Sequence, residues 1–449
     1  MLEKREGMLS TYRVLDLTDE KGLLAGKILG DLGADVIKVE RPGGDAARNI
    51  GPFYHDEPDP QKSLFWFSLN TSKRGITLNV ESADGREIFK KLVKSADFVL
   101  ESFAPGYLDK LGLGYSALEK INPGIIMVSI TAYGQNGPWK DRKTSDIVAW
   151  ALGGEMNLVG DFDRPPIRMS HHSQVYLQTG ADGAMGALTA LYHRGSTGEG
   201  QQVDVSTLES AAYSSIYYNP GPWNVRAGAG AAAPAPAAGA APGAGARPGG
   251  GARPGTAAGG GAMSSRGPRA GAPHKTTQIY PCKDGYICYS HGGSSRLSPS
   301  LPLIKWMDIE GYTDDFLKSF DWDRPDFAQI PQEDMDRIEG PTTKFFMTHT
   351  KAEILEGAVK YQIMLYPVAT TQDMLENPQL AARGFWVELE HPDLGVTLSY
   401  PGAFGLFSEA PIKIRRRAPL IGEHNDEIYG KELGISKEKQ LILKQAGVI

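Results

Sequence analysis

The chain has 449 residues and a mass of 48.5 kDa, which is enough for two lobes with separate hydrophobic cores. Apolar residues make up 41% and charged residues 22%, as in ordinary globular proteins, and no apolar run approaches the roughly 18 residues of a membrane span. Forty-seven basic and 53 acidic residues leave a net charge of −6, which argues against a nucleic-acid or anionic-membrane surface. The charged first residues have no apolar stretch behind them, so we expect no secretory signal and a cytoplasmic location.

The first part of the chain predicts strands that alternate with helices. Short runs rich in Val, Ile and Leu predict strands at 12–17, 34–40, 75–80, 97–102 and 124–130. Helices are predicted at 23–32 and from a cap at Ser82 through Val93. This alternation indicates a buried parallel sheet of the doubly wound α/β class. No Gly-x-Gly-x-x-Gly follows the first strand, so the dinucleotide-binding fingerprint is absent.

A helix with an unusually smooth surface is predicted from Gly180 to Arg194. Small residues stand at 180, 181, 183, 184, 186, 187 and 190, although each interior glycine costs about 1 kcal/mol of helix stability. Such a helix lets another backbone come close, which suits a core or a subunit interface. A strand then leads to Ser206 and Glu209, which form a capping-box pattern for the next helix.

Residues 226–272 form a low-complexity insert. Of these 47 residues, 43 are Ala, Gly, Pro or Arg, so the segment has too little apolar surface to offset its ordering entropy. One interpretation is a flexible linker between lobes. The other is a stretch that is not native, because these four residues have GC-rich codons and out-of-frame reading of a GC-rich gene would produce this composition.

The two cysteines, Cys282 and Cys288, flank an Asp-Gly turn signal. They are expected to occupy neighbouring positions on a hairpin. Two cysteines cannot form a disulfide framework, and their spacing matches no zinc motif.

Eight segments, taken together and in this order, resemble the class III CoA-transferases, which include formyl-CoA, carnitine and bile-acid CoA-transferases. The segments lie at 15–18, 32–42, 70–74, 101–112, 190–205, 280–286, 418–425 and 447–449. The resemblance implies a large α/β lobe, an inserted smaller α+β lobe, and two chains interlocked as a dimer. We expect the large CoA-binding lobe at 8–215, the insert at 226–272, the small lobe at 273–400, and a return to the large lobe at 401–449.

The resemblance also implies where coenzyme A is bound. The family's phosphate and adenine contacts fall on Arg41, Ser102, Phe103, Lys110 and Lys143, with Lys73 and Arg74 nearby. Arg41 follows a predicted parallel strand, and α/β sheets bind ligands at that end of their strands. Asp19 and Lys21 stand where the family often has His and Gln, so the contacts to the acid substrate cannot be carried over.

The family's catalytic carboxylate is missing. Catalysis in the family needs an Asp four residues before a glycine, ahead of the small-residue helix, and that position is Tyr176. The stretch from Pro165 to Ala181 contains no Asp or Glu, so a small shift of alignment does not supply one. Asp182 is six residues further on, about 600° around a helix, and is expected to face elsewhere.

Two other kinds of chemistry are disfavoured. The neighbouring His171 and His172 do not share a helix or strand face and have no obvious third ligand, so we expect no metal site. The racemases of the same superfamily need a His where this chain has Ser145, next to Asp146. A coenzyme A thioester is therefore expected as a substrate, with no covalently bound cofactor.

Two hypotheses follow. In the first, the chain is the subunit without the catalytic Asp in a hetero-oligomeric CoA-transferase, and a homologous catalytic subunit completes it. The enzyme would move CoA from a succinyl-CoA-like donor to a carboxylic acid, for example an aromatic succinate such as benzylsuccinate. In the second, an active homodimer uses another carboxylate. A CoA-binding protein without catalysis is a third reading, and neither nucleic acid nor membrane is an expected partner.

Overall fold

The structure is a computed structural model, and it forms two compact units. The larger unit comprises Met1–Met156, Arg168–Ser214 and Glu376–Ile449, and the smaller comprises Asn157–Ile167 and Ser215–Leu375. The residues described are 7–160, 165–168, 170, 173–214, 274–292, 300–324 and 326–449. The low-complexity insert and the pair His171–His172 lie outside them. No helix in these ranges is both long and apolar enough to cross a membrane.

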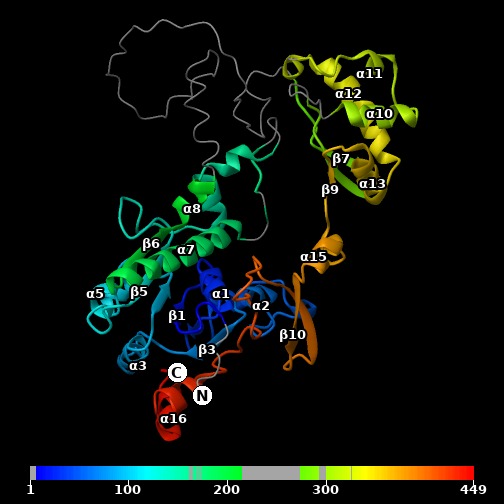
Figure 1. The fold of residues 1–449 in the computed structure, drawn as a ribbon. Helices are drawn as coiled ribbons and strands as arrows, with labels where there is room; N and C mark the ends of the chain where they lie inside the picture. The colour runs from blue at the N-terminus through cyan, green and yellow to red at the C-terminus, as the bar shows by residue number, and fades with distance from the viewer. Residues whose placement is uncertain are drawn as a thin grey trace, which may run out of the picture. The chain divides into compact units, whose positions relative to one another are not determined.

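A parallel six-stranded sheet forms the centre of the larger unit, in the order β3-β2-β1-β4-β5-β6 (Figure 1). The strands are β1 (Arg13–Leu17), β2 (Asp35–Glu40), β3 (Lys73–Thr77), β4 (Phe98–Glu101), β5 (Ile126–Thr131) and β6 (Gln202–Ser206). The predicted α/β class is confirmed. The third strand was misplaced, since it begins at Lys73 instead of residue 75 and ends at Thr77 instead of residue 80.

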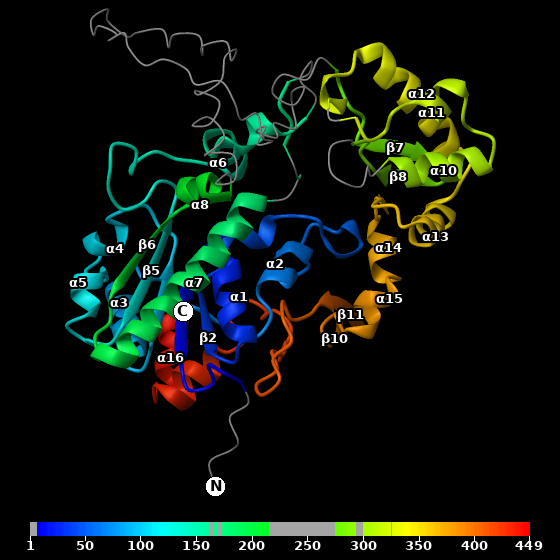
Figure 2. The same ribbon diagram turned by 45° about the horizontal axis from the view of Figure 1, so that its top comes forward.

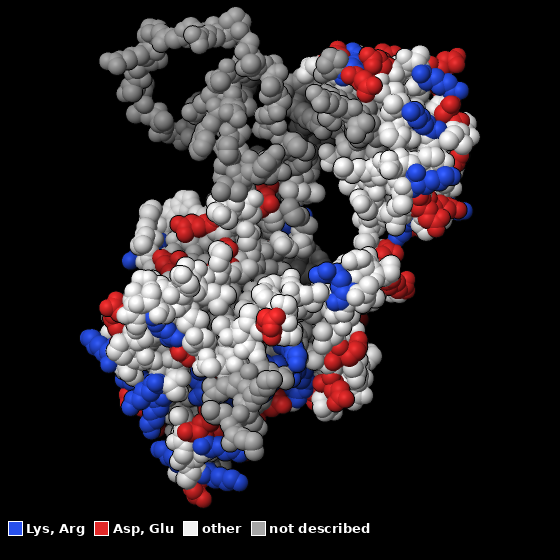
Figure 3. All heavy atoms as spheres, viewed as in Figure 1, with Lys and Arg blue, Asp and Glu red and all other residues white. Residues whose placement is uncertain are grey.

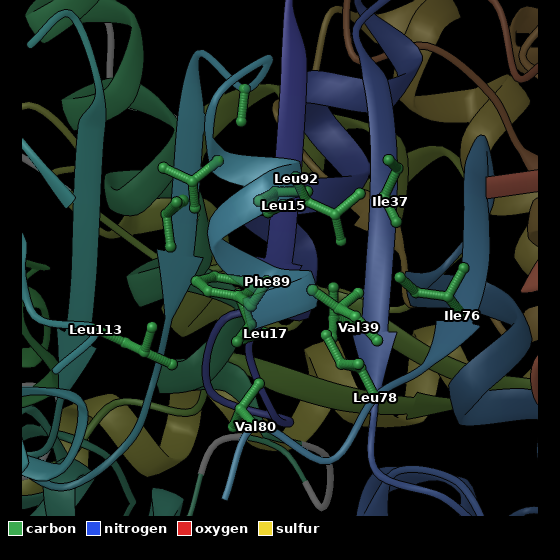
Figure 4. Close-up of a cluster of buried hydrophobic side chains, with 14 of the residues drawn as sticks. Leu15, Leu17, Ile37, Val39, Ile76, Leu78, Val80, Phe89, Leu92 and Leu113 are labelled. Atoms are coloured by element: carbon green, nitrogen blue, oxygen red, sulfur yellow. The ribbon is translucent and has the colours of Figure 1, made fainter. Parts of the chain in front are cut away.

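Helices cover both faces of this sheet. On one face, α1 (Leu23–Asp31) and α7 (Gln174–Thr197) pack on one apolar cluster, side by side in both ribbon views (Figure 2). On the other, α3 (Ala83–Val93), the π-helical segment η5 (Asp426–Glu432) and α16 (Lys437–Gln445) pack on a second cluster. Figure 4 shows Phe89 and Leu92 of α3 against strand residues such as Leu15 and Ile37.

Shorter elements connect these layers. They are α2 (Leu64–Leu69), α4 (Tyr107–Lys110), α5 (Tyr115–Leu118), α6 (Asp146–Leu152) and α8 (Thr207–Ser214). Two predicted caps are present: the Ser82 hydroxyl accepts from Gly85 N at 3.0 Å, and Ser206 accepts from Glu209 N at 3.3 Å.

The smooth helix lies directly against α1. A Cβ added at Gly180 would be 2.9 Å from Leu24 Cβ, and one at Gly183 would be 3.5 Å from Ala25 Cβ. Small residues on α7 thus let the two backbones approach, as the sequence predicted. Tyr176, one turn before Gly180, is thereby placed level with the residues that precede α1.

The smaller unit has its own core. The strands β7 (Ile279–Cys282), β8 (Gly285–Cys288) and β9 (Tyr366–Pro367) form an antiparallel sheet. Around it are α10 (Leu301–Ile309), α11 (Asp315–Ser319), α12 (Gln332–Met347), α13 (Lys351–Tyr361) and α14 (Thr371–Leu375). Both cysteines are free and lie on the β7–β8 hairpin, which confirms that prediction.

By its contacts, the chain returns to the larger unit at Glu376, whereas the sequence placed this return at residue 401. The segment in between holds α15 (Pro378–Ala382) and a hairpin of β10 (Trp386–His391) and β11 (Val396–Pro401). Leu389 and Tyr400 of the hairpin share a buried cluster with Trp66 of α2. This packing joins the hairpin to the larger unit.

Replacing Gly180 with alanine is expected to destabilise the protein by about 1–3 kcal/mol, because the new methyl group meets Leu24 and the helices must separate. The matched control is Gly195→Ala in the same helix, where an added Cβ meets nothing within 4 Å. There the loss of glycine should stabilise by about 0.5–1 kcal/mol. Urea denaturation of both variants measures this. Equal effects of the two substitutions would contradict the close packing of α1 and α7.

Candidate functional site

The strand order marks the place where α/β proteins bind ligands, in the crevice outside the carboxyl ends of the strands at the switch point. The strand order reverses between β1 and β4, so the connections that leave these neighbours diverge at their carboxyl ends. The two following loops are bonded together. Asp19 N donates to Ser102 Oγ at 2.8 Å, and Ser102 Oγ donates to Asp19 Oδ1 at 2.7 Å. The hydroxyl of Ser102, a predicted coenzyme A contact, is thus engaged by the loop after β1.

Lys73 lies inside the protein rather than beside the crevice. Its ammonium donates to Asp16 Oδ2 at 2.8 Å, Leu23 O at 2.8 Å and Asn70 Oδ1 at 3.0 Å, and the side chain is fully buried. Burial lowers the pKa of Lys73 to about 8, against the charge of Asp16. All three ammonium protons are used, so no donor remains for a phosphate in this arrangement.

A second buried lysine completes this group. Lys38 donates to Thr18 O, and its Nζ lies 3.7 Å from Asp16 Oδ1 and 3.5 Å from Asp45 Oδ2. Thr18 N and Oγ1 in turn donate to Asp16 Oδ1 at 3.0 and 2.6 Å. Burial alone would raise the pKa of Asp16, but the charges of Lys73 and Lys38 outweigh it and hold that pKa below its usual range.

Arg74 is also an internal cation. Its guanidinium donates to both oxygens of Asp35, at 2.9 and 2.6 Å, and to Glu427 and Glu432 at 2.7 and 2.5 Å. These bonds join β3 to β2 and to η5. Sequence reasoning placed Lys73 and Arg74 near the nucleotide, whereas the structure commits both to ion pairs within the larger unit.

Three of the predicted nucleotide contacts lie on neighbouring connections. Arg41 follows β2 with 71% of its side chain exposed, and its Nη2 is 3.6 Å from Glu81 Oε1. Tyr107 OH donates to the same Glu81 oxygen at 2.5 Å, and the Tyr107 ring stacks on Phe103 with centroids 4.7 Å apart. Lys110 ends the same short helix α4 and is exposed. Through Glu81 and Tyr107, the basic side chain of Arg41 and the flat ring of Phe103 are thus brought into one group of contacts.

Lys143 stands apart from this group in the described contacts. It is exposed in the connection between β5 and α6. On the face seen in Figure 3, groups of Lys and Arg and groups of Asp and Glu are intermixed.

Tyr176 lies at the start of α7 and is 6% exposed. Burial raises the pKa of its hydroxyl, and the charges of Glu20, Asp19 and Asp146 raise it further. The position that the resemblance predicts for the family's carboxylate therefore holds a buried, neutral phenol.

Asp146 is a positioning residue that sequence reasoning did not identify. Its Oδ1 accepts from Val175 N at 2.8 Å and Tyr176 N at 3.3 Å, and its Oδ2 accepts from Arg168 at 2.9 Å. The carboxylate thus caps α7, while Ser173 at the usual cap position makes no such bond. No local motif reveals a cap supplied 29 residues earlier in the chain.

Glu20 is a second residue that was missed. It is half-buried in the loop before α1, level with Tyr176, and its burial and the neighbouring charge of Asp19 raise its pKa. Among the described residues, no group of three His, Cys, Asp or Glu side chains could hold a metal ion.

Comparisons with known proteins identify the family of the chain. The model of CoA-transferase family III matches residues 9–245 and 252–425. The chain is 34% identical to a subunit, BbsE, of succinyl-CoA:(R)-benzylsuccinate CoA-transferase from Thauera aromatica, over 93% of each chain. It is 31% identical to formyl-CoA:oxalate CoA-transferase from Streptomyces avermitilis, over 98% of this chain and 99% of the relative.

A solved structure supports the fold. The crystal structure of a CAIB/BAIF family protein from Brucella suis superimposes with a TM-score of 0.71 and 26% identity, covering 95% of this chain and 99% of that one. Members of the matched family are enzymes that use coenzyme A thioesters as substrates. With the doubly wound sheet and these matches along nearly the whole length, the chain belongs to CoA-transferase family III.

Proposed function

We propose that this chain is the subunit without the catalytic carboxylate in a hetero-oligomeric CoA-transferase, and that a homologous chain supplies the Asp. The observation that carries the proposal is the buried phenol of Tyr176 at the position of the nucleophile. Homologous subunits of this kind would pair as the interlocked dimer that the family resemblance implies.

The chemistry explains why a phenol cannot replace the carboxylate. In the family reaction a carboxylate oxygen attacks the donor thioester, CoA thiolate leaves, and an acyl-enzyme anhydride remains. The thiolate then attacks the enzyme's own carbonyl carbon to give an enzyme–CoA thioester and release the donor acid. Acylated Tyr176 would be an aryl ester, whose only carbonyl belongs to the acyl group. It therefore offers no route to an enzyme–CoA thioester.

The substrate part of the proposal draws on the relative from Thauera aromatica. Its name gives succinyl-CoA as donor and (R)-benzylsuccinate as acceptor, and it is itself described as a subunit. We assign this chain a succinyl-CoA-like donor and an aromatic succinate acceptor. The larger unit, to which the chain returns at Glu376, would hold the coenzyme, and the smaller unit would help to select the acid.

Within this proposal, Arg41, Lys110 and Lys143 contact the phosphates of coenzyme A, and Ser102 and Phe103 line its nucleotide. The support is the clustering of Arg41, Phe103 and Lys110 at the carboxyl ends of β2 and β4. Lys73 and Arg74 hold the surrounding frame through their ion pairs.

An active homodimer is the second candidate, and one observation favours it. Glu20 is a half-buried carboxyl group near Tyr176, and its charge raises the pKa of the Tyr176 hydroxyl. In that case Glu20, rather than a residue of a partner, would be acylated.

Trapping experiments separate the two candidates. The purified chain, incubated with succinyl-CoA and then treated with borohydride or hydroxylamine, should show no modified carboxylate and no CoA transfer. When a neighbouring homologue is co-expressed and co-purified, the label should appear on that homologue alone, because only it has the nucleophile.

Labelling of Glu20 or any other carboxylate of this chain would refute the subunit assignment. Tyr176→Asp belongs in the same series. Label at the new carboxylate would show that the rest of the acylation site has kept its geometry.

Coenzyme A binding is expected even without catalysis, and it should weaken as salt is added because cations hold the phosphates. Replacing Arg41 with alanine should lower the affinity about 5- to 10-fold and flatten the salt dependence. The control is Lys91→Ala, an exposed lysine on α3 away from the crevice, which should leave binding unchanged. Titration calorimetry measures both. Equal affinities of the two variants would remove Arg41 from the site.

A further inference from the structure

A cavity of about 110 Å³ lies beside the loop that follows β4. Its lining includes Glu101, Tyr107, Asp109, Tyr115, Gln135 and Gln202. Along β4, Leu100 belongs to the cluster under α1 and α7, while Val99 belongs to the cluster under α3. Since side chains alternate along a strand, Glu101 points to the α3 side, the face of the sheet opposite to Tyr176.

Glu101 is 4% exposed. Its carboxylate accepts hydrogen bonds at one end of a chain of side-chain hydrogen bonds that runs across β4, β5 and β6. Its Oε2 accepts from Phe103 N at 2.8 Å, and the hydroxyl of Ser129, its partner on β5, also hydrogen-bonds to the carboxylate. Gln202 Nε2 on β6 donates to Ser129 Oγ at 3.1 Å. The direction of these donors suits an ionised Glu101.

We propose that Glu101 is a positioning residue for coenzyme A: its carboxylate fixes the backbone at Phe103, and loss of its charge loosens the loop and weakens coenzyme binding. The proposal rests on the coenzyme A site proposed above, because Ser102 and Phe103 follow Glu101 directly in the chain and Lys110 ends the helix α4 that comes after them. The proposal adds that coenzyme A binding at this site depends on pH through Glu101.

The physical reason is the strength of the bond to Phe103. A hydrogen bond to an ionised carboxylate is about twice as strong as one to a neutral acid. Protonated Glu101 would donate a hydrogen bond to Ser129 instead of accepting one, so the hydroxyl of Ser129 would have to reorient. The loop after β4 is also held where Ser102 meets Asp19, where Tyr107 N donates to Ala104 O, and where Phe103 stacks on Tyr107 and packs on the cluster under α3. The bond from Phe103 N to Glu101 is the one among these contacts that depends on the charge of Glu101.

The groups that face Glu101 keep its protonation change close to neutral pH. Burial raises the pKa of Glu101 to about 7, the bonds from Ser129 and Phe103 oppose this, and the charges of Asp109 on α4 and Asp19 before α1 add to it. Tyr107 and Tyr115 also line the cavity, and no lysine or arginine is among the described lining residues. The negative charge of Glu101 is present above this pKa and is lost as the pH falls through it.

The test compares coenzyme A affinity of the wild-type protein and Glu101→Gln by calorimetry between about pH 6 and about pH 8. Wild-type affinity should rise about fivefold more than that of the variant, with a midpoint near pH 7. The phosphates of the ligand titrate in the same range, but they do so equally with both proteins. Glu87→Gln, an exposed carboxylate on α3, is the control and should follow the wild type.

Two further readouts separate positioning from damage. At about pH 8 the thermal midpoint of Glu101→Gln should exceed that of the wild type, because a desolvated charge is removed, while its affinity is lower. Ser129→Ala removes a bond that lowers the pKa of Glu101, so it should move the affinity midpoint to higher pH.

Parallel pH curves for the wild type and Glu101→Gln, or affinity that falls with rising pH, would overturn the role of Glu101 while leaving the coenzyme site in place. Absence of coenzyme binding by the wild-type protein at every pH would overturn the proposed coenzyme site, and this inference with it.

Discussion

The carboxyl edge of the central sheet depends on the buried carboxylate of Asp16 and its two lysines. Lys38 on β2 and Lys73 on β3 both reach this carboxylate, and Thr18 N, at the start of the loop after β1, donates to it. Removing one member of a buried ion pair costs about 3–5 kcal/mol, because the partner keeps its charge without compensation. The three groups therefore hold the loop after β1 in one position, and that loop carries Asp19 to Ser102 and Glu20 to the level of Tyr176.

These ion pairs also explain what the sequence could and could not predict about the fold. Strand β2 was evident because Val36, Ile37 and Val39 mark it as buried. Strand β3 begins with Lys73 and Arg74, which look like surface cations in a linear pattern. Their partners lie 57 and 39 residues earlier in the chain, so only the folded structure shows that their charges are neutralised. The same long-range pairing explains why the start of this strand was predicted two residues too late.

In the candidate site, too, some residues could be predicted from the sequence and others could not. The family resemblance pointed to Tyr176 through its spacing to Gly180 and Arg194, which lie in one helix. Asp146, which caps that helix from 29 residues away, and Glu101, whose bonds cross three strands, have no local signal. Patterns within one element can be interpreted from sequence, whereas groups that act through contacts between elements cannot.

The phenol of Tyr176 lies in acidic surroundings. Asp19, Glu20 and Asp146 all place negative charge near the phenol. A further carboxylate among them would be difficult to ionise, since both burial and like charges raise the pKa of an acid. A neutral phenol fits these acidic surroundings. The helix packing at Gly180 and the cap from Asp146 hold the start of α7, and with it Tyr176, in place.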